Sequence, residues 1–164
     1  MVAMRATGPR RRGVPRRRRS PGNGVVSALV LSLALPALAA AADDFVVIVH
    51  PSVTGASIRR PDLAAVFLKK AARWGSGGSA IPVDQSGTSP VRESFSKAVL
   101  GMPVAAAVQF WQKQMFETKP LRPPVVRGSD AEVIAFVAKT EGAVGYVSKT
   151  ATLPPGVRTI AVIE

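Results

Sequence analysis

The chain contains no cysteine and a single histidine, His50, among its 164 residues. Without cysteine there are no disulfide bonds, no thiolate metal sites and no thiol catalysis, and a zinc site would need several histidines. No serine and histidine that could act as nucleophile and base can be paired from the sequence. We therefore predict a protein that is not an enzyme, needs no cofactor or metal, and has a core that is stable without covalent cross-links.

Acidic residues are missing from the first 42 positions, where eight arginines lie. The rest of the chain holds 14 Lys and Arg against 10 Asp and Glu, a net charge of +4, so the total of +12 mostly reflects the amino-terminal segment. An Arg-rich arm suggests nucleic-acid binding, but here an apolar run, Val25–Ala42, follows it directly. A basic segment, an apolar run and an alanine-rich end are typical of a secretory signal peptide.

We therefore predict a Sec signal peptide over residues 1–42, cleaved after one of Ala39 to Ala42. The alternative is an uncleaved anchor, because a mostly apolar run of about 18 residues can just span a bilayer. Pro36 and the alanines favour cleavage. Residues 43–164 would then form one periplasmic domain with no stable membrane anchor, and the absence of any long basic run within them argues against nucleic acid as a partner.

Residues 45–164 alternate between strand-like and helix-like patterns. β-branched runs predict strands at 45–50, 80–83, 142–147 and 159–163; the first is expected to be buried on both faces, and the second, with Pro82, to be an edge or a strand end. Cap residues, prolines and helical spacing predict helices at 61–71, 89–99, 103–116 and from Ser129 onward. This alternation predicts an α/β fold with a mixed or mostly parallel sheet and about four helices.

Residues 84–95 are the most informative stretch, because a turn at Gly87 leads straight into a helix capped by Ser89. Such a junction presents backbone N–H groups at the positive end of the helix dipole, close to the hydroxyls of Ser86 and Thr88. We expect an oxyanion, most simply phosphate, to bind there, with Ser86, Gly87, Thr88, Ser89 and Arg92 as the candidate ligand-binding residues. The competing interpretations are a capped turn without a ligand and, for Arg92, a solvated charge on an exposed first turn instead of a ligand.

Four segments, in order, resemble the phosphate-binding periplasmic proteins of ABC transporters. They are Asp62–Lys70 with Trp74, Ile81–Val83, Ser86–Ser89 with its helix, and Gly142–Val147. The resemblance is closest to short, single-lobe members and covers about Val46 to Val147. It implies a single lobe of a type 2 periplasmic-binding-protein-like fold, with a mixed sheet flanked by about four helices. It also implies that Ser86, Gly87 and Thr88 hold phosphate and that ABC transporter membrane subunits are partners.

The sequence departs from this family at several positions. Pro82 stands where larger members have an arginine that clamps the anion, and Arg92 is the candidate to replace it. Ser52 and Thr54 are candidates for the contacts that a second lobe would supply, and Tyr146 either lines the cleft or fills the core. The missing clamp also supports an alternative function, an envelope protein–protein interaction module that has lost its ligand. Lys69 stands where the family often has glycine.

Overall fold

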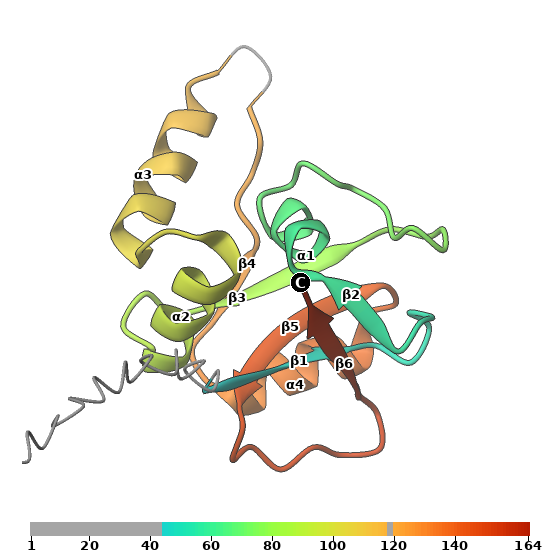
Figure 1. Ribbon diagram of the computed structural model, residues 1–164. Helices are drawn as coiled ribbons and strands as arrows, with labels where there is room; N and C mark the ends of the chain where they lie inside the picture. Colours follow the sequence, from blue (N-terminus) through green and yellow to red (C-terminus); the bar gives the residue numbers. More distant parts are fainter. Residues whose placement is uncertain (1–43, 118–119) are drawn as a thin grey trace, which may run out of the picture. The chain divides into compact units, whose positions relative to one another are not determined.

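The computed structural model describes residues 44–117 and 120–164, so the predicted signal peptide at residues 1–42 lies outside the described residues. Six strands and five helical segments follow one another in the described chain (Figure 1). None of the helices in these two ranges has the length and apolar character needed to cross a bilayer. The elements are β1 (Phe45–Val49), β2 (Ser57–Arg59), α1 (Arg60–Phe67), β3 (Ile81–Gln85), α2 (Pro90–Phe95), the π-helical η1 (Ser96–Leu100), α3 (Val104–Met115), β4 (Val125–Arg127), α4 (Asp130–Lys139), β5 (Ala143–Ser148) and β6 (Arg158–Ile163).

The strands form one mixed sheet in the order β2-β6-β1-β5-β3-β4. Strand β1 runs antiparallel to both of its neighbours, β5 and β6, whereas β3 is parallel to β5 and β4, and β2 is parallel to β6. All strands except β1 therefore point the same way. The predicted mixed α/β fold is confirmed, and the direction of β1 decides which loops share an edge of the sheet.

Strand β1 is buried on both faces, as predicted. Phe45, Val47 and Val49 face a core formed with α1, α2 and η1, whose rings include Phe67 and Phe95. Ile48 faces the opposite core, which α4 covers with Val133 and Val137. Burial of this kind removes apolar area from water at about 25 cal/mol per Å², which is the main stabilising term of the sheet.

Gly145 allows α4 to approach the sheet closely. A Cβ at this position of β5 would lie 2.7 Å from Val133 Cγ1 and 2.8 Å from Val83 Cγ1, closer than carbon atoms can pack. The glycine of the predicted Gly142–Val147 strand therefore has a packing role.

Three expectations about elements are corrected or narrowed by the structure. Strands β2 and β4, of three residues each, lie in segments without a strand pattern and form because a neighbouring strand offers hydrogen-bonding groups. Strand β3 lies inside the sheet, so it is not an edge; the other alternative holds, because Pro82 is the second residue of the strand and the pairing with β4 begins only at Val83. The first helix ends at Phe67, four residues early.

Helix α3 forms where it was predicted, but only part of its apolar stripe is buried. Trp111 is buried, whereas Val108 is 42% exposed and Met115 is 52% exposed. Figure 1 shows α3 extending away from the sheet, so the far end of its stripe meets no other element. The helical spacing predicted the helix correctly, but fewer residues of the apolar stripe are buried than the spacing suggested.

Lys69 has an unusual backbone conformation because of the way α1 ends. Lys70 N donates to Ala65 O (2.8 Å) and Lys69 N donates to Val66 O (3.1 Å), the two bonds of a Schellman motif. The motif needs a left-handed residue, and Lys69 has φ 57°, the one positive φ of a non-glycine residue among those described. A left-handed residue is most often glycine, which has no Cβ to clash with the neighbouring backbone.

Replacing Lys69 with glycine should stabilise the domain by about 0.5–1 kcal/mol, because glycine adopts the left-handed conformation without the Cβ clash. Urea unfolding of Lys69→Gly against the wild type measures the change. Lys70→Gly is the matched control and should not stabilise. Equal or lower stability of Lys69→Gly would contradict the strain at this position.

Candidate functional site

Three parallel strands, β3, β4 and β5, end at the same edge of the sheet. Ser86 follows β3, Gly128 follows β4 and Lys149 follows β5. In open α/β sheets, ligands bind outside the carboxyl ends of the strands. This edge is therefore the candidate site.

A pocket of 340 Å³ lies at this edge, between the starts of α2 and α4, and we call it the strand-end pocket. Each helix has a serine cap: Ser89 accepts from Arg92 N (3.4 Å), and Ser129 accepts from Glu132 N (3.3 Å). Helix amino ends carry partial positive charge, so two of them favour a negative ligand. The pocket is lined by Gln85, Ser86, Thr88, Ser89, Pro90, Val91, Gly128, Ser129 and Asp130.

The hydroxyls of Ser86 and Thr88 lie together at the mouth of the strand-end pocket. Ser86 Oγ is 3.1 Å from Thr88 Oγ1, and Thr88 N is 3.5 Å from Ser86 Oγ. Thr88 is exposed and Ser86 is half-buried, so both hydroxyls can rotate to donate to a ligand in solution. The structure thus brings together the two hydroxyls that the sequence predicted.

Some backbone N–H groups of the turn donate hydrogen bonds within the protein, and others have no acceptor among the described residues. Ser86 N donates to Arg127 O (2.9 Å), and Ser89 N donates to Ser86 O (3.0 Å). Within the described ranges, the amides of Gly87 and Val91 have no acceptor. Both N–H groups are therefore unbonded next to the hydroxyl pair; Val91 lines the strand-end pocket, whereas Gly87 is outside its lining.

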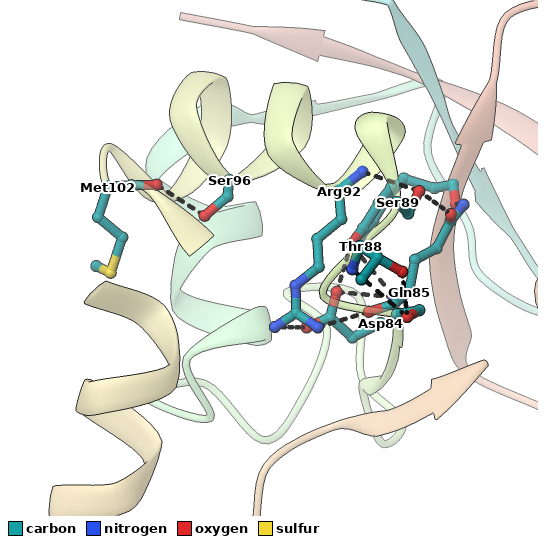
Figure 2. Close-up of polar contacts among 9 residues, drawn as sticks. Asp84, Gln85, Thr88, Ser89, Arg92, Ser96 and Met102 are labelled. Atoms are coloured by element: carbon teal, nitrogen blue, oxygen red, sulfur yellow. Dashed lines mark hydrogen bonds and ion pairs between the residues drawn. The ribbon is translucent and has the colours of Figure 1, made fainter. Parts of the chain in front are cut away.

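Ser89 caps α2, and its hydroxyl proton already takes part in a hydrogen bond within the protein. Its hydroxyl donates to Gln85 Oε1 (2.7 Å) while it accepts from Arg92 N. Figure 2 shows Ser89 and Gln85 next to each other at the start of α2. Ser89 therefore lines the pocket as a cap, and its hydroxyl can donate to an anion only if the bond to Gln85 breaks.

Gln85 is a residue of the site that the sequence reasoning missed. Its Nε2 donates to Asp130 Oδ1 (2.7 Å) and to Tyr146 O (3.0 Å), while its Oε1 accepts from Ser89. Asp130 in turn accepts from Ser148 N (3.2 Å). One buried amide side chain thus joins the end of β3 to both helix starts and to β5. The only sequence signal was a polar residue directly before Ser-Gly-Thr.

Arg92 is buried, and the expectation of an exposed first-turn charge is wrong. Its side chain turns inward from α2 (Figure 2), where Nη2 lies 2.9 Å from Asp84 Oδ2 and Nη1 donates to Gln85 O (2.5 Å). The residue is 8% exposed. A guanidinium engaged in this way anchors the turn from below, and its role as a ligand stays an untested prediction.

The partner of Arg92, Asp84, lies in a fully bonded cluster. The Tyr146 hydroxyl and Gln85 N both donate to Asp84 Oδ1. Burial raises the pKa of Asp84, and the positive charge of Arg92 and the hydrogen bonds oppose that shift. Tyr146 is fully buried and stacks on Phe95 with ring centroids 3.9 Å apart, so it fills the core and does not line a cleft. Burial, followed by the charge of Asp84, raises the pKa of the Tyr146 hydroxyl.

Arg92→Met should destabilise the domain by about 3–5 kcal/mol at neutral pH, because Asp84 is left as an unpaired buried charge. Loss of Arg92 also raises the pKa of Asp84 further above its unfolded value. An acid with a raised folded pKa favours folding at low pH and loses that contribution as pH rises through the folded pKa. Chemical unfolding should therefore show a smaller loss at pH 5 than at pH 8; a loss below 1 kcal/mol at pH 8 would contradict the buried ion pair.

Ser52 and Thr54 do not belong to this pocket. Strand β1 runs antiparallel to β5, so its carboxyl end lies beside Gly142, at the start of β5, where Gly142 N donates to Ser52 Oγ (3.0 Å). Ser86 lies five residues beyond Ile81, the first residue of β3, so the strand separates that edge from Ser86 by roughly 17 Å. The expected contribution of these hydroxyls to one anion site fails because of the direction of β1.

His50 and Ser52 form a local pair that the sequence did not reveal. Ser52 Oγ lies 2.7 Å from His50 Nδ1, which also accepts from Ser52 N (3.1 Å). Val53 N donates to His50 O (3.0 Å) and completes the turn. The pair closes the turn after β1, with the serine hydroxyl held by Gly142 N.

A neighbouring depression of 330 Å³ carries a second hydroxyl pair with the same local pattern. Ser148 Oγ lies 2.8 Å from Thr150 Oγ1, and Thr150 N donates to Ser148 Oγ (3.2 Å). This pair begins at Ser148, the last residue of β5, and no helix starts directly after it in the chain. It provides an internal comparison for the Ser86 and Thr88 pair.

The sequence matches no protein-family model and no curated protein. Solved structures do match in fold. They include an ABC-type phosphate transport receptor from Vibrio cholerae (TM-score 0.55, 16% identity) and PstS from Borrelia burgdorferi (TM-score 0.54, 15% identity). A third is a Clostridium perfringens structure with bound phosphate, assigned as a phosphate ABC transporter substrate-binding protein (TM-score 0.55, 17% identity).

Each match covers 73% of this chain but only 46%, 47% and 45% of the three solved chains, respectively. The chain therefore spans less than half the length of these neighbours. At such low identity the similarity establishes the fold, which agrees with the predicted lobe of a periplasmic-binding-protein-like architecture. It does not favour the alternative of an interaction module.

Proposed function

We propose that the domain is a non-catalytic solute-binding protein for phosphate or a similar oxyanion, and that the anion binds in the strand-end pocket. The observation that carries this proposal is the pair of open amides, Gly87 and Val91, beside the exposed hydroxyls of Ser86 and Thr88. These groups surround the start of a helix whose dipole favours negative charge. The fold shared with phosphate-binding neighbours supports the choice of phosphate.

Neutral donors make most of the contacts in this proposal. Hydroxyl and amide hydrogen bonds to an anion are charge-assisted and about twice as strong as neutral ones. Arg92 is paired with Asp84, so it supports the turn while Ser86, Gly87 and Thr88 contact the anion. Ser89 holds the helix start in place through Gln85.

Two observations, the amino-terminal segment and the neighbours of the same fold, support a proposal for the location and partners of the protein. We infer export to the periplasm through the predicted signal peptide at residues 1–42. Neighbours of the same fold are ABC-type transport proteins, which supports ABC transporter membrane subunits as partners.

The double variant Ser86→Ala and Thr88→Ala should weaken phosphate binding at least about tenfold, because each hydrogen bond to a charged group contributes about 1.5–3 kcal/mol. Isothermal titration calorimetry measures the change. The matched control is Ser148→Ala with Thr150→Ala, which removes the second hydroxyl pair and should leave the affinity unchanged.

Two outcomes would contradict the proposal. Equal affinity of the wild type and the Ser86 and Thr88 double variant would place the anion elsewhere. No binding of phosphate, arsenate or sulfate to the wild type, with no rise in melting temperature at millimolar anion, would favour the interaction module instead.

A further inference from the structure

A second and larger cavity, of 540 Å³, lies at the other end of the sheet. It is bounded by β2, β6, helix α1 and the loop that follows α1, and we call it the α1 cavity. Figure 1 shows this loop leaving α1 and extending outward before the chain returns as β3. Strands β1 and β5 separate β6 from β3, so roughly 14 Å of sheet lies between the α1 cavity and the strand-end pocket.

The wall of the α1 cavity is mostly apolar and has a fixed aromatic ring. Ile58, Val66 and Ile160 line the cavity together with Trp74. The indole of Trp74 is held by a hydrogen bond from Nε1 to Gly142 O (2.9 Å). Small-molecule sites commonly have volumes of about 300–1,000 Å³, apolar walls and a few polar groups. The α1 cavity fits that description.

Two arginines at the rim give the α1 cavity its charge preference. Arg59 donates to both carboxylate oxygens of Asp62, at 2.9 and 3.2 Å, so these two charges cancel. Arg73 is exposed, and no ion pair involves it in the described ranges. The lining therefore keeps one positive charge without an ion-pair partner among the described residues, beside its apolar residues. Thr54 adds a hydroxyl to the lining.

We propose that the α1 cavity binds a small amphipathic anion: a carboxylate on an aliphatic or aromatic body. The apolar body lies against Trp74 and Ile160, and the carboxylate lies at the rim near Arg73. This site is separate from the strand-end pocket and does not depend on the proposed binding of phosphate. It also gives a function to Thr54, which lies too far away to join Ser86 and Thr88.

Octanoate is a suitable probe because it has the predicted chemistry and does not absorb at the wavelengths of tryptophan emission. The chain has two tryptophans, so Trp111→Phe leaves Trp74 as the only reporter. Titration of this variant with octanoate should shift Trp74 emission saturably. The neutral 1-octanol should bind more weakly, by about three- to tenfold, because it cannot pair with Arg73.

Two variants test the assignment. Arg73→Gln should reduce octanoate affinity by about three- to tenfold, while Arg122→Gln, an exposed arginine outside the cavity, should not. Ala65→Leu, which fills the cavity, should abolish the fluorescence shift; a melting curve confirms that it folds. The Ser86 and Thr88 double variant should bind octanoate normally.

Three results would overturn the proposal: no saturable shift with octanoate in the folded Trp111→Phe protein, equal affinity in Arg73→Gln and Arg122→Gln, or loss of octanoate binding on addition of phosphate. Loss of phosphate binding alone would refute the proposed function and leave the α1 cavity unaffected.

Discussion

The ion pair between Arg92 and Asp84 is the contact on which the geometry of the strand-end pocket depends. It joins the first turn of α2 to the end of β3, directly beneath the Ser-Gly-Thr turn. Burying two charges has a desolvation penalty that their attraction offsets only when the remaining polar atoms are also bonded. Tyr146 and Gln85 provide those bonds, and no buried side-chain polar atom in the described ranges lacks a partner.

This pair also decides how the pocket can hold an anion. A guanidinium engaged with Asp84 and with Gln85 O holds in place the turn that carries the hydroxyls and the unbonded amides. Preorganised donors lose less entropy when a ligand binds. In the proposed site, selectivity for an anion would then come from the geometry of the hydrogen-bond donors more than from net charge. Pro82 is buried in β3 and carries no charge, which fits a pocket that relies on neutral groups.

Local chemistry was predictable from the sequence, whereas contacts made across the sheet were not. The caps at Ser89 and Ser129 and the hydroxyls of the turn follow from short-range preferences that need no neighbour. Arg92 is buried because it pairs with Asp84 near the end of β3. Helical spacing alone does not indicate that a strand residue lies there as a partner. The separation of Ser52 from the pocket depends on the direction of β1, which no periodicity encodes. The short strands β2 and β4 likewise exist only because a partner strand lies alongside.

Nuclear magnetic resonance of the ¹⁵N-labelled protein during a phosphate titration tests the central claim most directly. The N–H resonances of Gly87 and Val91 should shift together and saturate, because these two amides have no acceptor among the described residues. Ser86 N and Ser89 N, which are bonded inside the turn, should shift less. Saturable shifts centred away from residues 86–91, or no shifts at millimolar phosphate, would contradict the account.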